Sequence, residues 1–311
     1  MARAPDAVGP AKGPHVLLKL ARLAAVVLLL GCGAARSSDA CPALFADGRA
    51  PELTNPKLAP RTLALCFDAY AVLHSGVART PLYAAEHLTR ASVAAARLVE
   101  RIDAFHDEDR VPPDDRARLD DYVRSGFDRG HLAPAGDMPT GEAQAQSFSL
   151  ANIVPQDRVL NRSLWAAIEE STRRLATRRG QLFVVTGPVY AGDELASING
   201  RVLVPTQMFK AIYDPVAGEG GAWLAPNDGS GTFQSVSLAA LRTIAGIDAF
   251  PSLPPGQKAS AMTLPEPRAY SRDDIANHRP RGREQTWQDW LGHEAVRALH
   301  RALRQLLRAI F

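Results

Sequence analysis

The chain has 311 residues, of which 46% are hydrophobic, so it is long enough for one large domain or two small ones with a buried core. Its formal charge is +3, but residues 1–31 account for this excess with four basic residues against one acidic residue. The rest of the chain holds as many acidic as basic groups, so net charge gives no argument for a nucleic-acid partner. The three cysteines form no zinc-binding pattern.

Residues 1–31 have the features of an export signal. Basic residues lead into the apolar run 23–31, which is too short to span a bilayer stably. The run ends in Leu-Leu-Gly-Cys, which resembles a bacterial lipoprotein box in which Cys32 is lipidated; cleavage near Ala35 is the alternative. We expect an exported protein that is periplasmic and lipid-anchored to the bacterial membrane, or secreted. Gly33 in place of an aspartate after Cys32 favours the outer membrane.

The other two cysteines, Cys41 and Cys66, are expected to form a disulfide, because an exported protein can oxidise its remaining pair. The bond would tie the N-terminal arm to a strand at residues 62–73. In the chain-entropy model such a loop contributes roughly 3 kcal/mol.

The chain beyond Cys32 divides into three predicted parts. Residues 33–58 are small, polar and Pro-containing and are predicted to be a tether, residues 59–253 a folded domain, and residues 254–311 a Pro-rich segment followed by a helix.

Within the domain the patterns predict strands grouped together with few helices, which favours an α+β fold with a central antiparallel sheet over a doubly wound one. Predicted strands cover 62–73, 80–88, 181–189, 202–213 and 221–226, and Pro205 confines one of them to an edge or a bulge. Segment 103–121 is predicted to be a loop with one short helix at most, 147–154 to be extended, and 160–174 and 235–247 to be helical.

Residues 283–310 have the pattern of an amphipathic helix, with leucines on one face and Arg297, Arg301, Arg304 and Arg308 on another. A terminal helix docked by its leucines is the simplest interpretation. Contact with anionic lipid or with a nucleic-acid backbone is the functional alternative.

The most informative segment is 128–138, which reads Asp-Arg-Gly-His-Leu-Ala-Pro-Ala-Gly-Asp-Met. A neutral His131 is a suitable base for activating water, and Arg129 places a permanent cation nearby. Gly130 is expected to allow a tight backbone turn, and Asp128 to fix the segment by capping or pairing.

Asn161 and Glu169 lie on the predicted helix 160–174. Asn161 is either the N-cap of this helix or a ligand of Mg²⁺, which binds few protein groups and keeps several waters. Glu169 follows eight residues later, about 80° around an ideal helix, so we expect it to reach the ion through a water molecule.

These motifs resemble the DNA/RNA non-specific endonuclease family, which includes endonuclease G and has a ββα-metal (His-Me finger) active site. The resemblance covers residues 60–253. It rests on the segment 128–138 and on Ser-Leu-Ala-Asn-Ile-Val-Pro-Gln at 149–156, Leu-Asn-Arg at 160–162 with Trp165 and Glu169, Val-Thr-Gly-Pro-Val-Tyr at 185–190, Val-Pro-Thr at 204–206 with Phe209 and Lys210, and Phe-Pro at 250–251.

The resemblance implies a Mg²⁺-dependent endonuclease, with Mn²⁺ as a substitute, that cleaves DNA and RNA to leave 5′-phosphate ends. Its implied site residues are His131 as general base, Asn161 as the protein ligand of the metal, Glu169 as a contact through water, Arg129 and more weakly Arg79 and Arg162 on phosphate, and Asn152 as an orienting or phosphate-bonding group. It also implies a homodimer as one possible assembly.

Two other functions stay open from the sequence. One is a lipid-anchored module on the same fold that binds nucleic acid without cleaving it, and the other is a phosphodiesterase of a different substrate. The presence of His131, Asn152, Asn161 and Glu169 favours the enzyme over the idle module.

Overall fold

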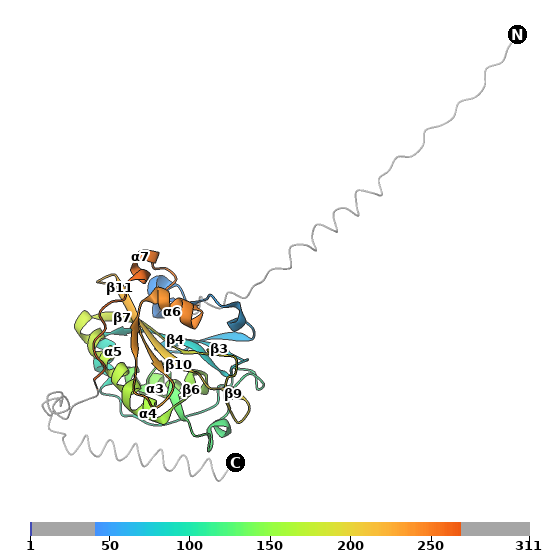
Figure 1. The fold of residues 1–311 in the computed structure, drawn as a ribbon, viewed down its shortest axis with the longest axis horizontal. Coiled ribbons are helices and arrows are strands. Elements are labelled where there is room, and N and C mark those ends of the chain that lie inside the picture. Colours follow the sequence, from blue (N-terminus) through green and yellow to red (C-terminus); the bar gives the residue numbers. More distant parts are fainter. Residues whose placement is uncertain (2–40, 269–311) are drawn as a thin grey trace. The chain divides into compact units, whose positions relative to one another are not determined.

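A computed structural model describes Met1 and residues 41–268. Residues 41–268 are built around a seven-stranded sheet (Figure 1). Its strands are β2 (Thr62–Cys66), β3 (Tyr70–Ser75), β4 (Thr80–Thr89), β7 (Gln181–Val189), β10 (Gln207–Asp214), β11 (Glu219–Pro226) and β12 (Gln234–Val236). They lie in the order β12-β11-β10-β7-β4-β3-β2, and every adjacent pair is antiparallel. The predicted α+β class with a central antiparallel sheet is confirmed.

Two of the predicted strands are interrupted. Segment 62–73 forms the hairpin β2–β3, in which the Phe67 amide donates to the Tyr70 carbonyl over 2.9 Å. Segment 202–213 splits into β9 (Val202–Leu203), which pairs with β8 (Ser197–Ile198), and the central strand β10. Pro205 lies in the break, because it lacks the N–H that a central strand needs.

Each face of the sheet is covered by a helix. Successive side chains on a strand point to opposite faces, so Val184 packs in one core cluster and Val185 in the other. The first cluster includes Ile168 of α5 (Ala166–Arg179), and the second includes Leu241 of α6 (Leu238–Ala245). The two helices therefore lie on opposite faces of the sheet (Figure 1).

Beside the α5 face a short hairpin is followed by a helix. Strands β5 (Asp128–His131) and β6 (Ile153–Gln156) pair antiparallel, and the chain then enters α4 (Arg158–Leu160), the π-helical turn η9 (Asn161–Trp165) and α5. The predicted helix 160–174 thus begins earlier and extends to Arg179. This strand-strand-helix unit holds the sequence motifs.

The segment between β5 and β6 is less extended than expected. Of the predicted extended stretch 147–154, Ser147 ends helix α3 (Gly141–Ser147) and Leu150–Asn152 form the 3₁₀ turn η8, so strand structure begins only at Ile153. The turn forms because the Ser149 hydroxyl accepts from the amide of Ala151, a local bond that competes with a strand.

The expected tether 33–58 is wrong from residue 41 onward. These residues form the 3₁₀ turns η3 (Pro42–Leu44), η4 (Ala46–Gly48) and η5 (Pro56–Leu58) and the strand β1 (Glu52–Leu53), which pairs with β13 (Ile247–Asp248). The Cys41–Cys66 disulfide is present, with Cα atoms 6.1 Å apart, and Phe45 is buried in the α6-side core. A covalent link and an apolar anchor therefore hold this arm on the domain.

The remaining elements are short. They are α2 (Arg90–Ala96), which begins at a capping box between Thr89 and Ser92, the 3₁₀ turns η6 (Leu119–Tyr122) and η7 (Ala135–Asp137), and α7 (Pro255–Ala259). As predicted, segment 103–121 is a loop with one short helical turn, η6, which begins near its end. Helix α6 confirms a helix within the predicted range 235–247 but is shorter, because residues 235–236 belong to strand β12 and Ile247 belongs to β13.

Several expectations concern residues outside the described part. These are the signal segment 1–31, Cys32 and the helix 283–310. Across residues 41–268, no helix combines the length and hydropathy needed to cross a bilayer.

His74 on β3 makes stability depend on pH. It is buried, its Nε2 donates to the Asp115 carbonyl over 2.9 Å, and burial lowers its pKa to about 4. The unfolded chain, with a histidine pKa near 6.5, then binds more protons than the folded chain between these two values. His74 therefore removes stability as the pH falls below about 6.5.

We predict that His74→Gln flattens this dependence, because glutamine can also donate to the Asp115 carbonyl but does not titrate. Urea unfolding at pH 7.5 and pH 4.5 should show wild type losing roughly 2–3 kcal/mol more than the variant. Equal losses in both proteins would contradict a neutral buried His74.

Candidate active site

His131 lies at the end of β5 in an aromatic enclosure. Its ring centroid is 5.0 Å from Phe148, edge-on, and 5.4 Å from Phe105. Its Nε2 is buried and has no hydrogen-bond partner among the described residues. Burial first, and then the nearby charges of Arg101 and Arg129 against that of Asp103, lower the pKa of His131 to about 3. The imidazole is therefore neutral at physiological pH and is able to accept a proton.

Gly130 is required for space and not for a turn, which corrects our expectation. It pairs with Val154 inside the β5–β6 ladder, and its φ is not in the left-handed region. A Cβ at this position would overlap the buried side chain of Gln156. Glycine therefore allows the Gln156 side chain to pack directly against the backbone of β5 next to His131.

Asn161 is not the N-cap of its helix. That role belongs to Asp157, whose Oδ1 accepts from the amides of Val159 at 2.8 Å and Leu160 at 3.0 Å. The Asn161 side chain instead donates through Nδ2 to Asp128 over 3.0 Å. This bond fixes the amide and leaves its Oδ1 with no hydrogen bond from residues 41–268, which frees an oxygen to bind a cation.

The π-helical turn η9 brings Glu169 onto the same side as Asn161. On an ideal α-helix, eight residues separate two side chains by about 80°. A π turn contains one residue more than an α-helical turn. The side chains of Asn161 and Glu169 are therefore oriented as if they were seven residues apart on an α-helix, which separates them by about 20° around the axis. Both residues line one cavity of about 240 Å³ with Arg129 and His131. Helix geometry alone could not predict this convergence.

Glu169 sits against a buried charge network. Burial raises the pKa of Glu169 to about 7, despite the opposing effect of Arg173 and Lys210. Arg173 donates to Asp137 over 2.7 Å and to Glu170 over 3.0 Å. The cavity therefore has a carboxyl group on one wall and permanent cations beside it.

Arg129 and Arg101 stand where the small cavity meets a larger one. Both line the 240 Å³ cavity and also an adjoining cavity of about 480 Å³. Arg129 is exposed, stacks 4.2 Å from the Phe105 ring centroid, and has no ion pair with a described carboxylate. Arg101 pairs with Asp103 at 2.8 Å. Arg101 was not among the predicted site residues. A single arginine before a loop rich in Asp and Arg belongs to no motif with a recognisable residue spacing.

Three predicted site residues have other surroundings. Asn152 is fully buried, and its side chain bonds to the backbone of Ala133 and Ser147 at 2.8–2.9 Å, so it positions the loop after β5 and borders neither of the two cavities. Arg162 borders the larger cavity but forms two bonds of 2.7 and 2.9 Å to Asp128. Arg79 donates to backbone carbonyls and borders neither cavity. The structure therefore groups Arg101, and not Arg79, with the site.

The residues present fit a metal of the Mg²⁺ class. Residues 41–268 contain no cluster of three or more His, Cys, Asp and Glu side chains, which rules out a conventional multidentate cage within that range. One free amide oxygen with a carboxyl group nearby suits an ion that keeps most of its water shell.

We predict that Gly130→Ala lowers the free energy of unfolding by roughly 1–3 kcal/mol, because Gln156 must move out of a packed position. The matched control is Gly141→Ala at the start of α3, where a Cβ meets nothing within 4 Å. Urea unfolding of both variants checks this. A similar small effect in both would show that space beside Gly130 is not limiting.

Known proteins are similar to this chain in sequence and in fold. The pattern of the DNA/RNA non-specific endonuclease family matches residues 53–256. Human mitochondrial nuclease EXOG is 32% identical over 216 residues, covering 62% of this chain and 58% of its own, and nuclease C1 of Cunninghamella echinulata var. echinulata is 35% identical over 175 residues, covering 51% and 69%. A chain in the crystal structure of the EndoG/EndoGI complex superposes with a TM-score of 0.53 at 26% identity, covering 62% of this chain and 90% of that chain.

This chain thus spans 58% of the length of EXOG and 69% of that of nuclease C1. The family match extends over most of the described residues and includes β5, β6, η9 and α5. The chain therefore belongs to the DNA/RNA non-specific endonuclease family.

Proposed function

We propose that this protein is a metal-dependent endonuclease that hydrolyses phosphodiester bonds of both DNA and RNA. The observation that carries the proposal is the convergence of His131, Asn161, Glu169 and Arg129 on one small cavity. A neutral base, a free amide oxygen, a carboxyl group and an unpaired cation are the groups that phosphodiester hydrolysis needs.

Asn161 would hold the metal directly, and Glu169 would support it through water. Mg²⁺ is the proposed ion, with Mn²⁺ as a substitute, since both accept oxygen ligands. When bound, the ion supplies positive charge that stabilises the negative charge on the phosphate oxygens and on the departing oxygen. Asp128 holds Asn161 in place through its amide nitrogen, so the ligand atom is oriented before the ion arrives.

His131 would take a proton from the attacking water. The water oxygen forms a bond to phosphorus while the bond from phosphorus to O3′ breaks. The departing O3′ takes a proton from solvent, which leaves a 5′-phosphate and a 3′-hydroxyl. Burial keeps His131 neutral before the reaction, and the Phe105 and Phe148 rings hold its orientation. Arg129 would neutralise charge on a non-bridging oxygen during the attack.

The arginines around the site support binding without sequence preference. Arg101, Arg129, Arg158 and Arg162 border the larger cavity. Asp128 engages two of these, Arg158 at 3.5 Å and Arg162 at 2.7 Å, and Asp103 engages Arg101 at 2.8 Å, which leaves Arg129 for substrate. Contacts to phosphate carry no base information, and this is consistent with a nuclease that accepts both sugars.

We also propose that the enzyme works in an oxidising compartment. The Cys41–Cys66 disulfide supports this, because such bonds persist outside the reducing cytosol. An exported, lipid-anchored location through Cys32 is part of the same proposal. Globomycin-sensitive processing and palmitate labelling of the wild type, absent in Cys32→Ala, would test the anchor.

We predict that His131→Ala and Asn161→Ala each lower cleavage of plasmid DNA and of RNA by roughly 10²–10⁴-fold, and that EDTA abolishes it. His87→Gln is the matched control, since His87 stacks on Phe183 and borders neither cavity. It should keep wild-type activity. Substrate binding without cleavage in Mg²⁺ and Mn²⁺ by the wild type would instead favour the idle binding module.

A further inference from the structure

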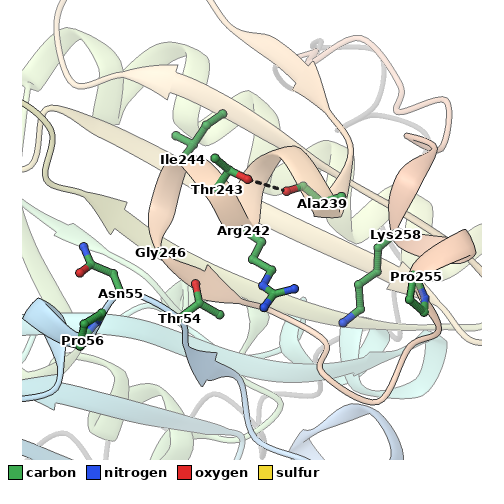
Figure 2. A pocket seen from close by; sticks show the side chains of 10 residues that line it. All are labelled: Thr54, Asn55, Pro56, Ala239, Arg242, Thr243, Ile244, Gly246, Pro255 and Lys258. Carbon is green, nitrogen blue, oxygen red and sulfur yellow. Dashed lines mark hydrogen bonds between the residues drawn. The ribbon is translucent and has the colours of Figure 1, made fainter.

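A larger cavity lies on the other face of the sheet. It has a volume of about 650 Å³ and is formed by the loop after β1, one side of α6, and α7 (Figure 2). Helix α6 packs in the core cluster on the opposite face of the sheet from α5. This cavity is therefore not a continuation of the cavity that His131 and Asn161 line. None of the proposed catalytic residues borders it.

Two cationic side chains extend into this space from different helices. Figure 2 shows Arg242 of α6 and Lys258 of α7 approaching the same region, with Thr54 across from them. Lys258 is nine-tenths buried and donates to the equally buried Asp248 over 2.7 Å. Arg242 is more than half exposed, and its one ion-pair contact with a described residue is 4.0 Å, to the same carboxylate.

The cavity therefore has one uncompensated positive charge and a surplus of hydrogen-bond donors. Asp248 is the single carboxylate facing the two cations in this part of the structure. Lys258 carries three N–H donors, of which one reaches Asp248, and the Arg242 guanidinium has no partner within hydrogen-bond distance among residues 41–268. Because Lys258 is buried, its remaining donors act in a low dielectric, where a charged hydrogen bond is stronger.

The opposite wall is held rigidly in place. The amides of Thr54 and Asn55 both donate to the Gly246 carbonyl, at 2.8 and 3.0 Å. Gly246 ends α6 in the left-handed conformation, and a Cβ there would meet the Asn55 Cβ at 2.5 Å. The wall thus contributes the polar side chain of Thr54 and the apolar ring of Pro56, and Ile244 of α6 adds apolar surface to the cavity.

We propose that this cavity binds a phosphate group, either as inorganic phosphate or as the phosphate of a nucleoside monophosphate. The Arg242 fork and the Lys258 ammonium would hold the phosphate oxygens. The volume and the apolar wall leave room for a sugar and a base. The site functions separately from the catalytic cavity, so the proposal does not depend on the nuclease activity.

The test measures phosphate binding by the full chain in EDTA, by equilibrium dialysis with radiolabelled inorganic phosphate and, separately, with dAMP. An Arg129→Gln background removes a phosphate contact at the catalytic cavity. In that background, Arg242→Gln is compared with Arg178→Gln, which removes the same charge from an exposed position on α5. Circular dichroism and thermal unfolding confirm that both variants are folded.

We expect saturable binding that Arg242→Gln weakens at least about tenfold and Arg178→Gln leaves unchanged. Tighter binding of dAMP than of inorganic phosphate identifies the nucleotide as the ligand, and the reverse order identifies free phosphate. Absence of saturable binding of both probes overturns the proposal. So does an equal effect, or no effect, of the two substitutions.

Discussion

The site depends on the buried ion network around Arg173. Its guanidinium, 12% exposed, joins Glu170 on its own helix to Asp137 in the turn that follows β5, and both carboxylates are almost completely buried. Removal of one member would leave an uncompensated buried charge, which is strongly destabilising. The network therefore fixes α5 relative to the loop after His131. The distance between the proposed base and the proposed metal ligand follows from that relation.

Asp128 has a comparable role at the other end of the hairpin. Its carboxylate binds Asn161 and Arg162 together, and these bonds hold its pKa below the ordinary value despite the opposing effect of burial. One side chain thus joins the start of β5 to the start of the helix. It also neutralises part of the positive charge of the surrounding arginines. A metal cation that approaches Asn161 is therefore repelled less strongly.

The two faces of the sheet carry cavities of different chemical character. On the α5 side, the strands support a hairpin, a π turn and a cavity with a carboxyl group and a neutral imidazole. On the α6 side, the same strands support a cavity bordered by Arg242 and Lys258, with the carboxylate of Asp248 beside them. Alternation of side chains along each strand makes this division possible, because substitutions facing one side leave the other packed.

The sequence by itself determined the family, the α+β class and the short motifs on which the proposed site residues of β5, η9 and α5 lie, and it predicted the Cys41–Cys66 pairing. These rest on short contiguous motifs and on periodicity, which are local properties of the chain. Only the tertiary structure decided that Asn161 and Glu169 line one cavity, that Gly130 is needed for space beside Gln156, and that residues 41–58 pack on the domain. It likewise brought Arg101 to the site and left Arg79 outside. Each of these depends on contacts between segments far apart in sequence, or on one additional residue in a helical turn, and neither is encoded in residue spacing.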